Sequence, residues 1–409
     1  MIISIDQNIN QIKSIIEKHL SKEPNRTIFD ISLDINEVND IKKLLSVKSL
    51  IEIINKSYPH LTFNFNITYI KNRDYSINSK ICKVLEDLDN YLRKEYKVQL
   101  KMRTKKELDK SFGFRDVVNA NRKIDSIVNK VKNATFQGEN LSPFEKLMLI
   151  YEEVTDHIYK EDESYYLLSS SHWIPVVNGD TIVCTGYASL IQEISKRVFS
   201  DKEVLILDND VDVFDKRTDE KIDAHASNIV LIKDKKYNIN GMFYLDSCWD
   251  SIEHKGEKKG YAYCCTPLFD IAQHKLFYFD FRKVYHYNLE EIYDNFFGFN
   301  KLNKFFKKLP FLKELGNDTQ YFDDKSSLHY FINNYDDLPI KSVIPLEAYT
   351  QSFKIIGSLN GLTGNELKEY VKTRIDDSVS KTKFYFNHKN CISCFANIIN
   401  NTMPEQGKK

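Results

Sequence analysis

The sequence lacks several features that would direct it to a membrane or to nucleic acid. Its 58 lysine and arginine residues equal its 58 aspartate and glutamate residues, so no excess of positive charge favours nucleic acid or anionic lipid. No stretch reaches the roughly 18 consecutive apolar residues that a membrane span requires. The first residues, MIISID, contain no basic segment followed by an apolar one, as a secretory signal would. We therefore expect a cytoplasmic protein with no membrane span and no nucleic-acid partner, with export by a dedicated secretion system left open.

Regular metal and phosphate motifs are also missing. The seven cysteines are an odd number without a regular framework, which disfavours disulfides and fits a reducing compartment. His388 precedes a CxxC pair, Cys391 and Cys394, but a structural zinc site needs four ligands and the chain has no second CxxC. The glycine-containing stretch 357–364 is expected to be a loop, and its spacing matches no phosphate-binding motif. We expect neither a metal nor an organic cofactor.

The length of 409 residues exceeds the usual size of one hydrophobic core, so several regions are expected. Apolar and polar residues alternate at 27–33 and 61–68, which predicts half-buried strands. Ser142, Pro143 and Glu145 form the signature of a capped helix start. Together the patterns predict an α+β protein with four regions: a small α/β region at 1–75, a helical connector at 76–140, a catalytic domain at 141–295 and a mainly helical region at 296–409.

Cys184 is expected to lie at the start of a helix. It stands in residues 182–188, which read IVCTGYA. The apolar residues that follow it recur at helical spacing: Tyr187, Leu190, Ile191, Ile194 and Val198. In the first turn of a helix, unpaired amides and the positive end of the helix dipole favour a thiolate. The same amides could contribute to an oxyanion hole, and Gly186 would permit the close approach of a substrate.

His225 and Asp246 are expected on neighbouring antiparallel strands. His225 begins an alternating run, residues 233–235 read as a turn, and 237–246 read as the returning strand. Side chains that face each other on such strands are separated by about 5 Å between Cβ atoms, which suits a carboxylate that orients an imidazole. A thiol, an imidazole and a carboxylate are the parts of an activated cysteine nucleophile. The three motifs together predict acyl-transfer chemistry.

Residues 141–250 resemble the core of the transglutaminase-like superfamily. Residues 183–188 (VCTGYA) are similar to the nucleophile motif of that family, 225–230 (HASNIV) to its histidine motif and 244–250 (YLDSCWD) to its aspartate motif. The resemblance implies a papain-like fold, in which a nucleophile helix packs on an antiparallel sheet. It also implies a catalytic triad of Cys184, His225 and Asp246.

Six further residues are candidates for contacts with a substrate or its oxyanion: His172, Trp173, Gly186, Tyr187, Asn228 and Trp249. The first two shortly precede the nucleophile, where they could line a cleft or support an oxyanion, or could serve packing or a turn. Two positions depart from the family pattern. Ser227 stands where the family commonly has tryptophan, and Ser247 with Cys248 replaces a usual proline–threonine pair. These departures affect the surroundings of the triad and leave its three residues in place.

The sequence therefore predicts a cysteine-dependent enzyme that acts on a protein or peptide substrate through an acyl-thioester. Cys184 would attack the carbonyl carbon, His225 would transfer the proton to the leaving amine, and Asp246 would orient His225. Water as the acceptor gives peptide hydrolysis or glutamine deamidation, whereas an amine gives transamidation, and the sequence leaves these open. The alternative prediction is a non-enzymatic peptide- or protein-binding module on the same fold.

Overall fold

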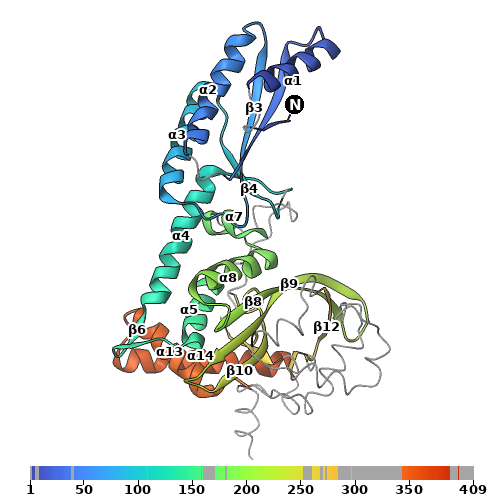
Figure 1. The fold of residues 1–409 in the computed structure, drawn as a ribbon. Helices are drawn as coiled ribbons and strands as arrows, with labels where there is room; N and C mark the ends of the chain where they lie inside the picture. Colours follow the sequence, from blue (N-terminus) through green and yellow to red (C-terminus); the bar gives the residue numbers. More distant parts are fainter. Residues whose placement is uncertain are drawn as a thin grey trace, which may run out of the picture. The chain divides into compact units, whose positions relative to one another are not determined.

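The computed structural model describes residues 2–4, 9–37, 41–107, 109–157, 159, 171–179, 182–251, 260–267, 270–271, 274–283, 296, 343–386 and 395 (Figure 1). The chain divides into two compact units, Met1–Ile124 and Asp125–Lys409. Both contain helices and strands, so the expected α+β class is confirmed. Among the residues that the structure describes, no helix is both long enough and apolar enough to cross a membrane.

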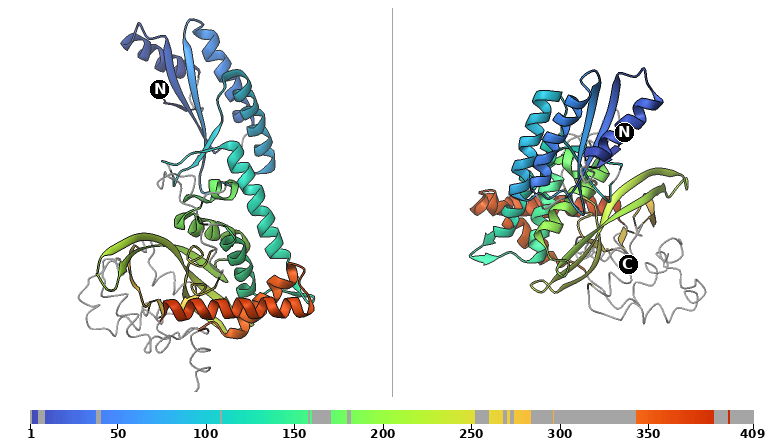
Figure 2. Two further views of the ribbon diagram at one scale, coloured as in Figure 1. Left: turned by 180° about the vertical axis from the view of Figure 1, so that it is seen from behind. Right: turned by 45° about the horizontal axis from the view of Figure 1, so that its top comes forward.

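The first unit is built on a sheet of mainly parallel strands (Figure 2). Its strands are β1 (Ile2–Ser4), β2 (Ile28–Asn36), β3 (Thr62–Lys71), β4 (Lys101–Thr104) and β5 (Phe112–Gly113). They lie in the order β1-β2-β3-β4-β5, and only β5 runs antiparallel to its neighbour. The connecting helices are α1 (Ile9–Lys22), α2 (Ile41–Ser57) and α3 (Ser79–Tyr96).

Strands β2 and β3 alternate as expected. On β2, Phe29, Ile31 and Leu33 are buried, whereas Asp30 between them is exposed. A sheet with one apolar and one polar face buries only the first against helices. The expected connector at 76–140 contributes α3, β4 and β5 to this unit. It also contains the whole of α4 (Phe114–Asn133), whose residues fall on both sides of the division at Ile124, and the short hairpin of β6 (Thr135–Phe136) and β7 (Glu139–Asn140).

The second unit is built on an antiparallel sheet. Its strands are β8 (Val204–Asp215), β9 (Lys221–Asp234), β10 (Ile239–Leu245), β11 (Thr266–Pro267) and β12 (Phe277–Lys283), in the order β11-β10-β9-β8-β12. Its helices are α5 (Pro143–Thr155), α7 (Trp173–Asn178), α8 (Cys184–Val198), α13 (Leu346–Leu359) and α14 (Gly364–Tyr385). Helix α8 packs on β8 and β9, and α5 packs on α8 and β9. A helix that begins with a cysteine and lies on an antiparallel sheet is the arrangement that the sequence predicts.

The start of α5 is fixed to the β9–β10 hairpin. The expected capping box is present, since the Ser142 side chain accepts from the Glu145 amide and Glu145 accepts from the Ser142 amide. The second carboxylate oxygen of Glu145 accepts hydrogen bonds from Lys236 Nζ at 2.8 Å and from the Tyr237 hydroxyl at 2.6 Å. These contacts hold α5 in a fixed register against the hairpin, which brings Tyr151 of α5 to the end of β10.

Helices α13 and α14 belong to the same compact unit as the antiparallel sheet. Helix α13 packs on α5 and α14, and the Tyr349 hydroxyl donates to the Cys264 carbonyl. The loop expected at 357–364 is shorter than predicted, because α13 continues through Gly357 to Leu359. Gly357 is buried, and a Cβ there would lie 2.6 Å from a Leu367 methyl group, so packing against α14 explains this glycine.

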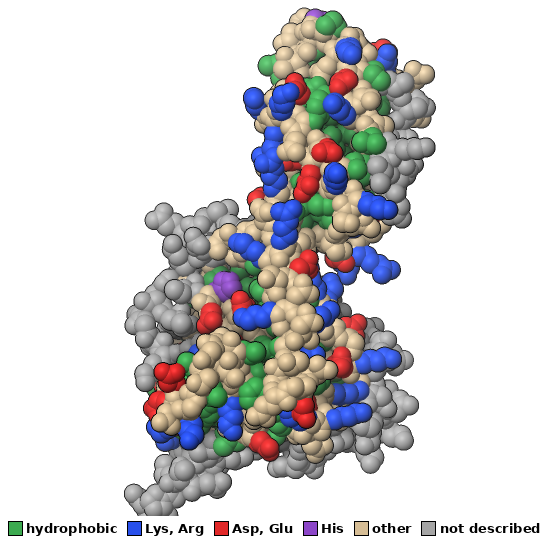
Figure 3. Space-filling model, turned by 90° about the vertical axis from the view of Figure 1, so that its left-hand side faces the viewer, with side chains coloured by type: hydrophobic (Ala, Val, Ile, Leu, Met, Phe, Trp, Pro, Cys, Tyr) green, Lys and Arg blue, Asp and Glu red, His purple; other side chains and the backbone are tan. Residues whose placement is uncertain are grey.

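Lys, Arg, Asp and Glu side chains are interspersed on the face that Figure 3 shows. This mixture agrees with the equal totals of acidic and basic residues in the sequence. Opposite charges at short spacing largely cancel beyond the Debye length of about 8 Å at physiological ionic strength.

Candidate active site

Cys184 is the first residue of α8, as predicted. Its N-cap, Val183, has an extended backbone and offers no side-chain cap. The Gly186 amide donates to the Val183 carbonyl at 2.8 Å and the Tyr187 amide to the same oxygen at 3.1 Å. First-turn amides lack acceptors inside the helix. The amides of Cys184 and Thr185 are therefore the better candidates for an oxyanion hole than the amide of Gly186.

His225 and Asp246 meet at the sheet. His225 lies within β9. Asp246 was expected to be the last residue of the returning strand, but β10 ends at Leu245, so Asp246 is the first residue after it. His225 Nε2 lies 2.6 Å from Asp246 Oδ2, and the two side chains are 2% and 1% exposed. A charged hydrogen bond of this length between buried groups is far stronger than a surface ion pair.

Three neighbouring groups fix Asp246. The Tyr244 hydroxyl donates to Oδ2 at 2.9 Å, and the Trp249 amide donates to Oδ1 at 3.0 Å. The Tyr151 hydroxyl lies 2.7 Å from the Asp246 carbonyl oxygen. Both carboxylate oxygens thus have donors besides His225, which holds the carboxylate in a single orientation.

The charge of Asp246 also sets the protonation state of His225. Burial by itself lowers the pKa of His225, but the charge and hydrogen bond of Asp246 and a hydrogen bond with the Cys184 side chain raise it to about 10. Since Nε2 faces Asp246, Nδ1 is the ring nitrogen available to Cys184. The raised pKa favours an imidazolium at neutral pH, next to the Asp246 carboxylate and Cys184. An imidazolium beside a thiol is the arrangement that activates cysteine nucleophiles in general.

Trp249 covers the imidazole. Its indole stacks on the His225 ring with a centroid separation of 4.8 Å and an interplanar angle of 27°. The other neighbours of the indole are aromatic too, with Tyr263 at 5.1 Å and His274 at 6.1 Å between ring centroids. Burial, with Lys216 and Lys275 nearby, lowers the pKa of His274 to about 3, so His274 is neutral and part of the packing. Of the six residues proposed for substrate contacts, Trp249 contacts two members of the triad.

His172 and Trp173 have structural contacts. His172 is the N-cap of α7, and its Nδ1 accepts from the Ile174 amide at 3.2 Å. Its ring stacks on Trp173 at 5.8 Å. The Trp173 amide donates to Ser189 Oγ at 3.1 Å, which joins α7 to α8. Both side chains are 6% exposed. These contacts explain the two residues as capping and packing of the helix pair.

Tyr187 and Asn228 also lie inside the fold. Tyr187 is fully buried, and its hydroxyl donates to the His157 carbonyl. Asn228 is fully buried on β9, and its Nδ2 donates to the carbonyls of Ala188 and Leu207 at 3.3 and 3.4 Å. The Asn228 amide therefore connects α8 to the sheet. Gly186 is buried in the first turn of α8.

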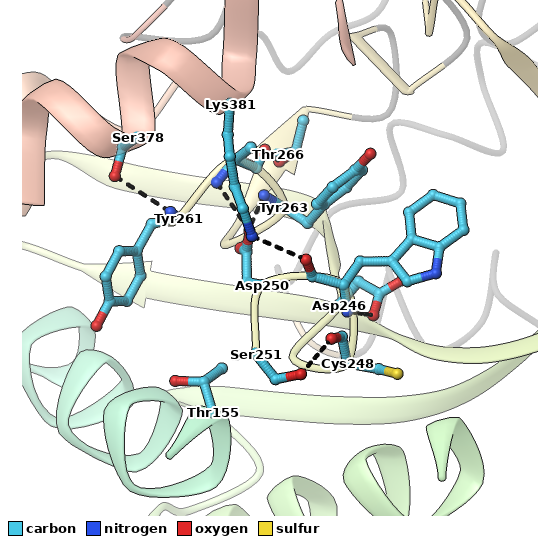
Figure 4. A network of polar contacts seen from close by, with 12 residues as sticks. Thr155, Asp246, Cys248, Asp250, Ser251, Tyr261, Tyr263, Thr266, Ser378 and Lys381 are labelled. Carbon is cyan, nitrogen blue, oxygen red and sulfur yellow. Dashed lines mark hydrogen bonds and ion pairs between the residues drawn. The ribbon is translucent and has the colours of Figure 1, made fainter. Parts of the chain in front are cut away.

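Asp250 is a residue whose role the sequence did not reveal (Figure 4). It is fully buried. Its carboxylate accepts hydrogen bonds from the Tyr151 hydroxyl at 2.8 Å and from the backbone amides of Ala262 and Tyr263 at 3.1 and 2.9 Å. Burial raises the pKa of Asp250 to about 7 against the opposing charge of Lys381. A second aspartate four residues after a catalytic candidate is a visible signal, but its partners come from distant segments.

Within the described part of the chain, no group of three or more His, Cys, Asp or Glu side chains is placed to hold a metal ion. His388, Cys391 and Cys394 lie outside the described residues. The five described cysteines, Cys82, Cys184, Cys248, Cys264 and Cys265, are free thiols.

The comparisons with known proteins give no relative. No protein-family model matches the sequence, and a search of curated proteins finds no match. The functional argument therefore rests on the three motifs and on the geometry of the site that contains them.

Proposed function

We propose that this protein is a cysteine-dependent enzyme that transfers acyl groups from amide bonds through an acyl-thioester. Cys184 is the nucleophile, His225 the general acid and base, and Asp246 the residue that orients and charges His225. The observation that carries the proposal is the 2.6 Å contact between His225 and Asp246, both buried, with Cys184 among the groups that raise the pKa of the same imidazole. The similarity of the three motifs to those of the transglutaminase-like superfamily supports the proposal.

The first half of the reaction forms the acyl-thioester. The Cys184 thiolate attacks the carbonyl carbon of the amide, a C–S bond forms, and the carbonyl electron pair moves to oxygen. The amides of Cys184 and Thr185 stabilise that oxyanion. His225 Nδ1 then gives its proton to the amide nitrogen, the C–N bond breaks, and the amine leaves.

The second half regenerates the thiolate. His225, now neutral, takes a proton from the acceptor, which attacks the thioester carbon, and the thiolate leaves with the C–S electron pair. Water as the acceptor completes peptide hydrolysis or glutamine deamidation, and a primary amine completes transamidation. The proton taken from the acceptor restores the imidazolium, so that the ion pair is ready for the next cycle.

The test uses a glutamine-containing protein probe, casein, with a fluorescent primary amine. Intact-mass and peptide measurements separate three results: amine incorporation, conversion of glutamine to glutamate, and chain cleavage. Cys184→Ser removes the thiol with little change of volume, and Cys82→Ser in the first unit is the matched control. Any of the three products that forms with wild type and Cys82→Ser, and not with Cys184→Ser, supports the proposal.

The alternative of a non-enzymatic binding module predicts a different result. Such a protein would retain the fold of the site and carry a Cys184 thiol no more reactive than the half-buried Cys82 thiol. Alkylation of the two thiols in the same sample therefore separates the two hypotheses without a known substrate.

A further inference from the structure

Helix α14, far along the chain, contacts the turn that follows Asp246. Lys381 Nζ donates to the Trp249 carbonyl at 3.0 Å and lies 3.8 Å from Asp250 Oδ1 (Figure 4). The Lys381 side chain is only 14% exposed and the Asp250 side chain is fully buried. One turn earlier on α14, Ser378 Oγ accepts from the Tyr261 amide at 3.1 Å. Helix α14 thus makes polar contacts with two separate segments near Asp250, the turn at Trp249 and the chain at Tyr261.

The packing around the Lys381 stem is close. A Cβ on Gly260 would lie 2.8 Å from Lys381 Cδ, so the glycine gives the aliphatic stem the space to reach the turn. The next turn of the helix continues the contact, since Tyr385 lies 5.4 Å from Tyr263 between ring centroids. A long flexible side chain confined in this way has a defined position for its ammonium group.

The turn that Lys381 contacts supports two members of the triad. Its Trp249 amide donates to Asp246 Oδ1, while the Trp249 indole stacks on His225. The Tyr151 hydroxyl lies within hydrogen-bond distance of both the Asp246 carbonyl and the Asp250 carboxylate. The Lys381 ammonium is therefore connected to the triad by two sets of contacts. One set is made by Trp249, and the other by Asp250 and Tyr151.

We propose that Lys381 is a positioning residue of the triad, and that α14 thereby forms part of the support of the active site. Its ammonium fixes the backbone at Trp249 and the carboxylate of Asp250, which holds the indole against His225 and the carboxylate of Asp246 in line with Nε2. The inference deepens the proposed function and rests on it for its catalytic meaning. The effect of Lys381 on the geometry of the His225–Asp246 pair, which the inference predicts, can be measured without turnover.

A residue that only stabilises the fold would alter thermal unfolding and leave the geometry of the folded site unchanged. Lys381→Met removes the charge and keeps much of the stem, whereas Lys381→Arg retains a cation that can still donate to Trp249. Lys372→Met is the matched control on the same helix, because Lys372 is 68% exposed and pairs only at the surface with Asp376. Lys381→Gln is a milder variant that keeps a donor without the charge.

Two measurements report directly on the site. The protein has two tryptophans, so a Trp173→Phe background leaves Trp249 as the sole tryptophan, and acrylamide quenching of selectively excited tryptophan fluorescence then measures the protection of its indole. The downfield proton of His225 Nε2, observed by NMR, measures the hydrogen bond to Asp246. The rate of Cys184 alkylation is recorded in parallel.

We expect Lys381→Met to unfold cooperatively but to show stronger quenching of Trp249, loss of the downfield proton, and alkylation slower by about 10- to 100-fold, the usual cost of a small misplacement. Lys381→Arg and Lys372→Met should resemble wild type, with Lys381→Gln between the extremes. Unchanged quenching and an unchanged proton signal in folded Lys381→Met would overturn the inference. If that variant does not fold, Lys381→Gln decides by the same two signals.

The failure of the proposed function has a different signature. In that case the wild-type Cys184 alkylation rate does not depend on His225, while quenching and the downfield proton still show whether Lys381 holds the pair together. The two hypotheses can therefore be rejected separately.

Discussion

Asp246→Asn should convert the imidazolium–thiolate pair into a neutral pair while leaving the shape of the site almost unchanged. The substitution removes the negative charge 2.6 Å from His225 Nε2, and an asparagine oxygen can still accept from the Tyr244 hydroxyl or the Trp249 amide. Burial, which disfavours the charged ring, then acts against the smaller contribution of Cys184, which favours it. We therefore expect the pKa of His225 in the variant to fall well below its value in the wild type.

The magnitude follows from the pKa of His225 in the wild type. Its rise from 6.5 to about 10 corresponds to about 5 kcal/mol in favour of the imidazolium, at ~1.4 kcal/mol for each pH unit. An unassisted thiol with an ordinary pKa of about 8.5 is only roughly 0.3% thiolate at about pH 6. Thiolates of low-pKa thiols are less nucleophilic, which offsets part of that factor. Alkylation of Cys184 near pH 6 should therefore slow by about 10- to 100-fold in Asp246→Asn.

The assay is an NMR titration of protein labelled with ¹³C-histidine, with the His225 ring carbon followed from about pH 5 to about pH 9. In wild type the ring should stay protonated over the whole range, and in Asp246→Asn it should be neutral over most of it. His225→Gln identifies the resonance. A His225 ring that stays protonated in Asp246→Asn as in wild type would refute the reasoning, because the charge of Asp246 would then not be its cause.

The remaining predictions concern stability. Tyr244→Phe removes a buried hydrogen bond to a carboxylate and should lower the free energy of unfolding by about 1.5–3 kcal/mol, measured by urea denaturation. The pKa of His225 is raised on folding, so its stabilisation is complete below about pH 6.5 and is lost as the pH rises through about 10; His225→Gln should abolish that dependence in unfolding curves. The pKa of Asp250 is also raised, from 3.8 to about 7, so its ionisation costs stability as the pH rises between those values. Relative to wild type, Asp250→Asn should therefore gain about 4 kcal/mol between about pH 4 and pH 8, and an equal difference at both ends would contradict the buried-charge argument.

Local sequence patterns predicted the elements that contain the triad. The helical spacing after Cys184 requires a buried stripe, and α8 begins at Cys184 as expected. The strand expected from His225 is present as β9, but it begins at Lys221, and residues 225–232 are all buried instead of alternating. The capping box at Ser142 and Glu145 is a contact between residues three positions apart, and it formed as predicted. Such features depend on neighbours in the chain and can be derived without the tertiary structure.

The support of the triad depends on distant residues and could not be derived in this way. Tyr151 reaches Asp246 across 95 positions and Lys381 reaches Trp249 across 132. Neither residue stands out locally, because a tyrosine in an apolar helix and a lysine in a charged one have many ordinary roles. The sequence shows Asp250 beside Trp249, but only its contacts with α5, with the Tyr263 amide and with α14 explain why a fully buried carboxylate is tolerated there.

His172 illustrates a role that the sequence left open. Its position shortly before the nucleophile allowed an oxyanion or cleft role as well as packing or a turn, and in the structure its Nδ1 caps α7 and its ring packs on Trp173. Proximity in sequence to a catalytic residue does not determine which way a side chain faces. The sequence offers a weaker signal for the structural role, since a polar residue that precedes an apolar run is a typical N-cap position.

The central claim, an ion-paired Cys184 thiol, is tested most directly by its rate of labelling with iodoacetamide from about pH 5 to about pH 9 in wild type and His225→Ala, read by mass spectrometry. Cys82 is the internal reference, because burial and the nearby Glu86 raise its pKa. We predict that Cys184 in wild type reacts rapidly well below pH 8.5 and that His225→Ala loses this reactivity. Labelling of Cys184 that follows an ordinary thiol in both proteins would contradict the claim.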